Sequence, residues 1–282
     1  MEADTSTAPS RGSRRILAFM NQKGGVGKTT TAVNLGAALA QRGRSVCMID
    51  LDPQAHLTLH VGLDPNELDH SVYDLLTDEE VTALEAMQRV DEELAVLPAE
   101  TDLAGAELEL ASREDRLTLL KRKLGGATDA FDYVMIDCPP SLGLLTLNAL
   151  AMAEAVVVPM QAHFLALQGL SKLLETVQLV RHQVNPALAV AGVVLCMHDG
   201  QTNLAREVVS DLEGFFASAE GLCEPWSGAR VFQPPVRRNV KLAECPSFGQ
   251  TIFQYEPWCA GARDYLALAE SFDAAGRDGR AG

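Results

Sequence analysis

Short apolar segments alternate with longer amphipathic segments along most of the chain. The short ones have the length and near-continuous apolar character of buried strands, which we expect at residues 14–21, 45–52, 94–98, 131–140, 153–160, 188–197 and 229–235. The longer ones repeat apolar residues at helical spacing, which predicts helices at 30–43, 167–184 and 202–219. Gly43 is a suitable C-terminal stop for the first helix. This alternation predicts an α/β fold with a doubly wound, mostly parallel sheet and helices on both faces.

The pattern weakens at both ends of the chain and in one internal segment. Residues 1–13 are polar and we expect a disordered tail there, while residues 275–282 are rich in glycine and we expect them to fray. Residues 14–274 contain no repeat and no linker, so we predict a single domain. The acidic segment 64–93 is interpreted as a solvated helical insertion over one end of the sheet.

Composition narrows the possible environments. The chain has 282 residues, and none of its apolar runs reaches the ~18–20 residues that a membrane helix needs. Residues 1–13 lack the apolar region of a secretory signal, and we expect no membrane association. The net charge of −15 disfavours diffuse affinity for nucleic acid, so any contact with DNA requires a local basic patch. Six scattered cysteines form no C-x-x-C pair, which favours packing of reduced thiols in the core over zinc binding. Reduced cysteines indicate a cytoplasmic protein.

The sequence "KGGVGKTT" lies between the first predicted strand and the first predicted helix. Glycines allow a backbone to wrap closely around phosphates, and a helix N-terminus adds a favourable dipole. In this interpretation Lys28 reaches the β- and γ-phosphates of ATP and the Thr29 hydroxyl ligates Mg²⁺. Gln22 occupies the first glycine position of the strict Walker pattern, so the segment is a deviant Walker A loop of a P-loop NTPase. Its predicted ATP-binding residues are Lys23, Gly24, Gly25, Val26, Gly27, Lys28, Thr29 and Thr30.

Acidic residues at the ends of two predicted strands complete the candidate chemistry. Asp137 ends the apolar strand "YVMID" and is placed to hold Mg²⁺. Asp50 and Asp52 follow the second strand and point the same way if the chain stays extended. One of these two carboxylates would support the metal, and the other would position the water that attacks the γ-phosphate. A turn fixed by Pro53 is the structural alternative.

Several long motifs resemble the ParA/Soj family of deviant-Walker partitioning ATPases, which are related to MinD. The similarity extends from Arg15 to Ala269 and includes "NQKGGVGKTTTAVNLG", "IDLDPQ", "LAGAELEL", "YVMIDCPPSLGLLTLNAL", "ALQGL", "RNVKLAECPSFG" and "GARDYLALAE". The resemblance implies an ATP-bound homodimer that sandwiches two nucleotides, with slow hydrolysis. It implies that Lys23 reaches the partner's nucleotide and that Asp52 orients the hydrolytic water, with Asp50 left for the metal. It thus makes Asp52, Lys23 and Lys28 the catalytic residues.

We expect Lys23→Ala to abolish ATP-dependent dimerisation and Lys28→Ala to weaken nucleotide binding itself.

The chain departs from the family pattern near its C-terminal end. The family signature implies that Asn239 contacts the base, whereas Arg237 stands where the family has proline. Family members bind DNA without sequence preference through basic residues in this region, but here Gln201 and Lys241 replace two arginines. We expect compensating phosphate contacts from basic neighbours, and the predicted DNA-binding residues are Arg206, Arg238 and Lys241.

The resemblance also implies a ParB-like partner that stimulates hydrolysis and docks near "SVYDLL". An acidic surface there would suit a basic segment of that partner, although an ordinary solvated helix is an equal alternative; its residues are Asp74, Asp78, Glu79 and Glu80.

Other functions remain open on the sequence. One is a relative that positions a protein cargo without DNA, and another is a nucleotide-locked adaptor with no useful turnover. A MinD-like membrane helix is not supplied by residues 266–282, and an iron–sulfur carrier lacks a C-x-x-C pair. The preferred interpretation is a switch that partitions DNA, and its DNA binding would associate the protein with the nucleoid.

Overall fold

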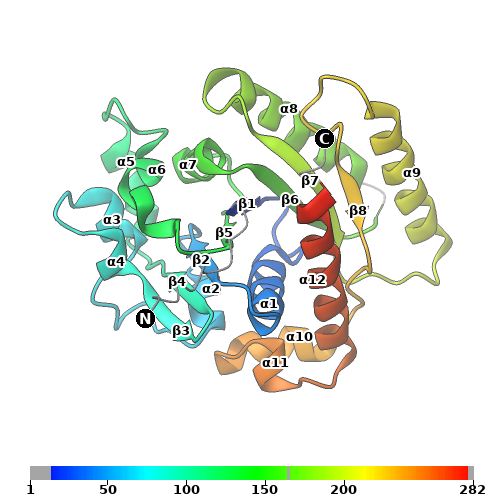
Figure 1. Cartoon of the computed structure of the whole chain (residues 1–282), viewed down its shortest axis with the longest axis horizontal. Helices are drawn as coiled ribbons and strands as arrows, with labels where there is room; N and C mark the ends of the chain where they lie inside the picture. The colour runs from blue at the N-terminus through cyan, green and yellow to red at the C-terminus, as the bar shows by residue number, and fades with distance from the viewer. Residues whose placement is uncertain (1–13, 164–165, 279–282) are drawn as a thin grey trace, which may run out of the picture.

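Eight strands form one sheet in the computed structural model, which describes residues 14–163 and 166–278 (Figure 1). The strands lie in the order β3-β4-β2-β5-β1-β6-β7-β8, and all pair in parallel except β3, which runs antiparallel to β4. Their bounds are β1 (Arg15–Phe19), β2 (Val46–Asp50), β3 (Gln88–Asp91), β4 (Leu94–Leu97), β5 (Tyr133–Asp137), β6 (Ala155–Met160), β7 (Ala189–Leu195) and β8 (Arg230–Phe232). The predicted mostly parallel sheet is confirmed, with each of the seven expected strands in place.

Helices cover both faces of the sheet because successive strand residues point to opposite sides. In β1, Ile16 and Ala18 pack into one buried cluster, whereas Leu17 and Phe19 pack into the other. Helices α1 (Lys28–Gln41) and α12 (Ala260–Asp278) cover the second face and contact each other (Figure 1). The first face is covered by α5 (Leu103–Leu110), α6 (Leu119–Leu124), α7 (Leu144–Met152), α8 (Ala166–Gln183) and α9 (Asn203–Ala219).

Short helices occupy the connections between these elements. They are α2 (His56–His60), α3 (Val72–Thr77), α4 (Ala83–Ala86), η1 (Gly125–Thr128), α10 (Val240–Glu244), η2 (Cys245–Phe248) and α11 (Ile252–Tyr255). The predicted stop of the first long helix is also present, because Gly43 has φ +74° and its N–H bonds the carbonyl of Ala40.

The register of the central strands brings their carboxyl ends together. Phe19 of β1 and Asp50 of β2 both lie opposite Asp137 of β5. The loops that follow these three strands therefore emerge side by side at one edge of the sheet, where open α/β sheets bind ligands.

The segment at residues 64–93 differs from the expected solvated helical insertion. It contains the short helices α3 and α4 and the edge strand β3, and Val72, Leu75 and Leu76 are buried in the core. The apolar positions of this segment were masked by its acidic composition, so the prediction of a solvated insertion was wrong.

The chain ends fall partly outside what the structure describes. Helix α12 continues to Asp278, four residues into the range expected to fray. The predicted tail at 1–13 and the last residues, 279–282, lie outside the described residues. None of the helices in the described ranges combines the length and apolar character needed to cross a bilayer.

Candidate active site

The phosphate loop leads directly from β1 into α1, and its glycines are conformationally required. Gly25 and Gly27 have φ values of +70° and +95°, a region that side chains other than glycine adopt at a cost. A Cβ on Gly27 would also lie 3.2 Å from the Cβ and Sγ atoms of Cys196. No side chain caps the start of α1, so its first N–H groups stay available for phosphate oxygens.

A pocket of about 870 Å³ opens over this loop and α1. Seven predicted site residues line it: Gly24, Gly25, Gly27, Lys28, Thr29, Thr30 and Asp52. The rest of the lining comes from the loops after β2 and β5 and from α2, α5 and η2: Pro53, Gln54, His56, Leu59, His60, Ala104, Pro139, Pro140, Ser141, Pro246 and Ser247. Its size and its convergence of polar groups suit a ligand as large as a nucleotide.

Three predicted ATP-binding residues lie outside this lining. Val26 is buried and packs beneath the loop, so only its backbone is suited to contact phosphates. Lys23 is exposed and points to the β6–α8 connection, where its Nζ lies 2.7 Å from the Nε2 atom of His163. Asn239 is the N-cap of α10, and its Oδ1 accepts the N–H of Lys241.

Thr29 and Asp137 form the part of the site that suits a divalent cation. The Thr29 hydroxyl donates to Oδ2 of Asp137 over 2.6 Å. The other carboxylate oxygen, Oδ1, is buried and has no hydrogen-bond donor among the described residues. Burial, with the nearby Asp50 carboxylate, raises the pKa of Asp137 well above its ordinary value. A cation beside Oδ1 would satisfy this atom, so the arrangement fits Mg²⁺.

That cation would need ligands from the nucleotide. Within the described residues, no group of three or more His, Cys, Asp or Glu side chains is placed to hold a metal ion. Mg²⁺ is commonly bound by one or two protein oxygens together with substrate phosphates, and the Thr29–Asp137 pair supplies that number.

Asp50 and Asp52 lie in different surroundings, whereas an extended chain was expected to point both the same way. Strand β2 ends at Asp50, so the side-chain alternation of a strand does not extend to Asp52. Asp50 is fully buried and accepts hydrogen bonds from the N–H and hydroxyl of Thr58 and from the N–H of Asp52. Burial raises the pKa of Asp50 to about 6 despite these bonds. Both of its oxygens therefore accept hydrogen bonds within the protein, and one of these bonds fixes the backbone of Asp52.

The Asp52 carboxylate reaches the pocket. Its Oδ1 accepts the N–H of Gln54, and no protein donor in the described residues bonds its Oδ2. An acceptor of this kind beside the phosphate loop is suited to orient a water molecule.

The end of β6 and the connection after it hold the phosphate loop in place through hydrogen bonds. The sequence did not indicate this role. Asn21 donates to the Pro159 carbonyl, and Gln161 donates to the Gly25 carbonyl. His163 adds the contact with Lys23. The only signal in the sequence was the polar "QAH" run after an apolar strand, and nothing local connects it to a loop about 140 residues earlier.

Two of the basic side chains near the C-terminal end are held by carboxylates. Arg237 donates from Nε and Nη2 to Asp264, which is almost fully buried, so Arg237 is a structural residue. Lys241 forms an ion pair with Glu244 over 2.9 Å and lies above the ring of Tyr255.

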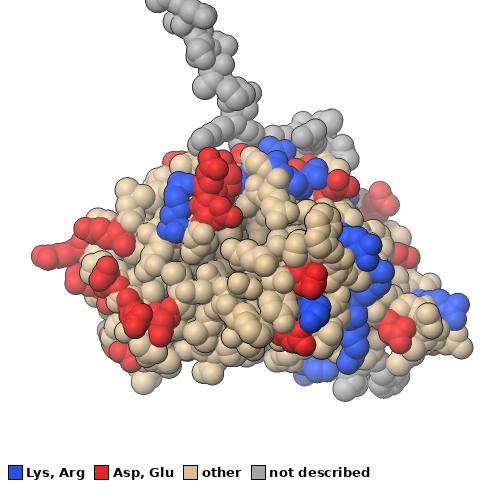
Figure 2. Space-filling model, turned by 90° about the horizontal axis from the view of Figure 1, so that it is seen from below, with Lys and Arg blue, Asp and Glu red and all other residues tan. Residues whose placement is uncertain are grey.

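The other two predicted DNA-contact residues are exposed. Arg206 donates to the Asn203 side chain, and Arg238 makes no ion pair within the described residues. Figure 2 views the molecule from below relative to Figure 1, and there most Lys and Arg lie in the right half, the half in which Figure 1 places α12 and α9, while Asp and Glu predominate in the left half.

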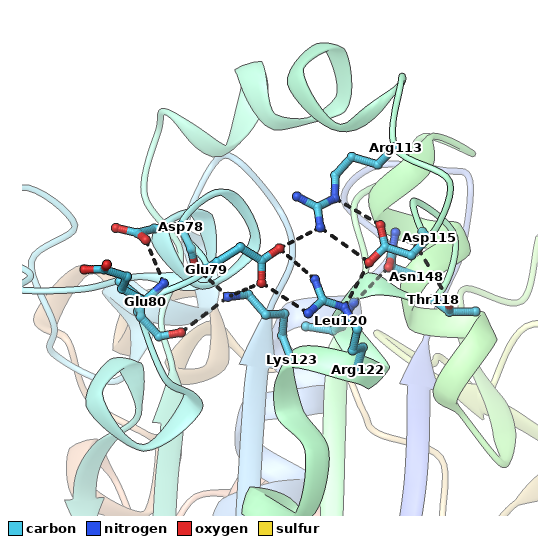
Figure 3. Close-up of polar contacts among 11 residues, drawn as sticks. Asp78, Glu79, Glu80, Arg113, Asp115, Thr118, Leu120, Arg122, Lys123 and Asn148 are labelled. Carbon is cyan, nitrogen blue, oxygen red and sulfur yellow. Dashed lines mark hydrogen bonds and ion pairs between the residues drawn. The ribbon is translucent and has the colours of Figure 1, made fainter.

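The acidic surface expected to receive a partner is partly engaged within the protein. Glu79 forms ion pairs with Arg113, Arg122 and Lys123 (Figure 3), and its hydrogen bonds from Arg122 and then Arg113 lower its pKa to about 2. Asp74 caps the start of α3 in a capping box. Glu79 and Asp74 are therefore structural, which leaves Asp78 and Glu80 as the freer acidic residues of the four.

Comparisons with known proteins relate this chain to one group of similar proteins. An "AAA domain" family model matches residues 14–190. The sporulation initiation inhibitor protein Soj of Bacillus subtilis is 43% identical over 262 residues, covering 93% of this chain and 99% of that protein. The chromosome partitioning protein ParA of Myxococcus xanthus is 42% identical over 90% of this chain and 86% of its own length.

A solved structure has the same fold and a related sequence. It is described as cobyrinic acid a,c-diamide synthase from Mycobacterium smegmatis with bound ADP and magnesium. Its TM-score is 0.77 at 38% identity, and the match covers 95% of this chain and 97% of that one.

Proposed function

Because this chain belongs to the ParA/Soj family of ATPases, we propose that it is an ATP-driven switch for partitioning chromosomal or plasmid DNA. The observation that carries the proposal is the convergence of Lys28, Thr29 and Asp52 on one pocket at the carboxyl ends of β1, β2 and β5, with Thr29 bonded to the buried Asp137 behind it. The ATPase family to which the chain belongs and this geometry both support hydrolysis of ATP to ADP and phosphate.

In this proposal the protein's own groups divide the work. The N–H groups of the phosphate loop and the Lys28 ammonium bind the phosphates, and Asp52 accepts a hydrogen bond from the attacking water. Thr29 and Asp137 would hold Mg²⁺, which neutralises charge on the phosphate oxygens when it is bound. Asp50 keeps the Asp52 segment in place through its bond to the Asp52 N–H.

The proposal extends to a homodimer with ATP, in which Lys23 reaches the partner's nucleotide. It also extends to sequence-independent DNA binding by this dimer and to a ParB-like partner. Arg206 and Arg238 are the residues best placed for phosphate contacts because they are exposed without a carboxylate partner among the described residues. Lys241 would first have to leave Glu244.

DNA binding by the Asp52→Ala protein, with ATP·Mg²⁺ or ADP across a salt series, tests the proposal. This variant should accumulate the ATP dimer because water is no longer oriented. We expect ATP-dependent binding that weakens steeply with salt, since each phosphate contact contributes about one unit to the salt slope. Arg238→Ala in this background should lower the slope by about one unit, whereas Lys121→Ala on α6 is a control with the same charge change.

A dimer that forms with ATP but ignores DNA at low salt would overturn the DNA part of the proposal. The protein would then belong with switches that position a protein cargo. Absence of ATP hydrolysis by the unmodified chain would overturn the ATPase itself, and Lys28→Ala gives the background rate for that assay.

A further inference from the structure

Lys23 is held on its own protomer by an imidazole in the structure. Its Nζ lies 2.7 Å from Nε2 of His163, which is in the β6–α8 connection. An ammonium group has only protons to donate, so Nε2 must be the acceptor. The contact therefore requires a neutral His163 that carries its proton on Nδ1.

The backbone on both sides of this contact is fixed. Asn21 joins the loop to the carbonyl of Pro159, and Gln161 donates to the carbonyl of Gly25. The Lys28 ammonium lies 3.5 Å from the carbonyl oxygen of Lys23. The bonds of Asn21 and Gln161 therefore hold the phosphate loop against the β6–α8 connection, which keeps Lys23 and His163 close together.

His163 and Lys23 meet beside a hollow lined mostly by apolar side chains. They share a small hollow of about 40 Å³ with Asn21, Gln161 and apolar side chains of β6 and α8. Lys23 and His163 are the titratable residues in its lining, which is otherwise Val26, Val158, Met160, Ala166, Gly169, Leu170 and Leu173.

We propose that His163 is a positioning residue that retains Lys23 on its own protomer while neutral and releases it when protonated. This inference rests on the proposed function, in which Lys23 reaches the partner's nucleotide. A neutral imidazole competes with that reach because its hydrogen bond must first break. A protonated imidazole has no acceptor and repels the ammonium. Mild acid therefore favours the ATP dimer through His163.

The experiment compares ATP-dependent dimerisation at about pH 6 and about pH 8. Sedimentation of the full chain with ATP·Mg²⁺, in the Asp52→Ala background, gives the dimer dissociation constant. We expect the protein with His163 to dimerise roughly tenfold more tightly at the lower pH, the effect of about one charge-assisted hydrogen bond. His182→Gln, an exposed histidine of α8, controls for general titration and should keep this pH dependence.

Two substitutions at His163 separate its acceptor from its charge. His163→Gln keeps an acceptor that does not titrate, so dimerisation should be weak at both pH values. His163→Leu removes the acceptor, so dimerisation should be tight at both. The inference is overturned if both variants keep the pH dependence of the parent protein, or if His163→Leu does not tighten the dimer.

A second measurement does not depend on dimerisation. Nitrogen-15 spectra of the nucleotide-free chain should show His163 as the Nδ1–H tautomer, and Lys23→Ala should shift it toward Nε2–H. An unchanged tautomer would contradict the proposed contact. Complete absence of an ATP dimer at either pH, with the expected tautomer, would instead overturn the trans role of Lys23 in the proposed function.

Discussion

Thr58→Val tests whether Asp50 holds the Asp52 segment or serves the metal. Thr58 is fully buried in α2, and its hydroxyl donates to Oδ2 of Asp50 over 2.8 Å. The same hydroxyl accepts the N–H of Ala99, which follows β4, over 2.9 Å. One side chain thus joins the ends of two strands and α2, and valine has nearly the same shape without the polar atom.

The expected cost follows from the two bonds that valine removes. Loss of the hydroxyl bond to a charged carboxylate costs about 1.5–3 kcal/mol, and a buried N–H left without a partner costs about 1–3 kcal/mol. The two losses share one atom and partial relaxation is available, so we expect about 2–4 kcal/mol in total. This is a large part of the ~5–15 kcal/mol that typically stabilises a protein.

Urea unfolding of the nucleotide-free chain with a metal chelator measures this cost. Thr58→Ser is the matched control because it keeps the hydroxyl and loses one methyl group, which costs about 1 kcal/mol. We also expect Thr58→Val to lower the rate of ATP hydrolysis, since the N–H of Asp52 bonds the same Asp50 carboxylate. Equal stability of the valine and serine variants would refute the structural role given to Asp50.

Three further predictions concern the metal, the DNA and the acidic network. Thr29→Ala should shift the Mg²⁺ requirement of ATP hydrolysis upward at least about tenfold, because one metal ligand is lost; an unchanged Mg²⁺ titration would contradict this. Glu244→Gln should strengthen ATP-dependent DNA binding and raise its salt slope by about one unit, because Lys241 is freed; an equal slope would exclude a phosphate contact from Lys241. The Glu79 pKa is lowered from 4.5 to about 2, so its contribution to stability is present above pH 4.5 and is lost toward pH 2. Glu79→Gln should lack this component in thermal unfolding between these pH values, and a melting curve with unchanged pH dependence would count against the Arg122 network.

Much of the fold and the centre of the site were predictable from the sequence because their determinants are local. A buried parallel strand must be apolar throughout, so the seven expected strands were found where the runs lie. The edge strand β3, "QRVD", has only four residues and alternates in burial, so its apolar content was too small to detect. The phosphate loop could be predicted because its glycines, Lys28 and Thr29 all lie within eight consecutive residues, and their function depends on that spacing.

Partner choice for charged side chains was not predictable, because it joins residues far apart in the sequence. Arg237 finds Asp264 on α12 and Glu79 finds Arg113 and Arg122, and neither pairing leaves a local signal. Composition indicated an acidic docking surface and a basic one. The fold decided which of those charges are already neutralised.

The sequence by itself determined that a phosphate loop begins the first helix and that carboxylates end the two neighbouring strands. Backbone geometry and strand order then require these groups to meet. Only the tertiary structure decided that the buried Asp50 accepts hydrogen bonds from Thr58 while Asp52 reaches the pocket, and that His163 lies against Lys23. The physical reason is that burial and hydrogen-bond geometry depend on which surfaces pack together, whereas the spacing of a motif does not record them.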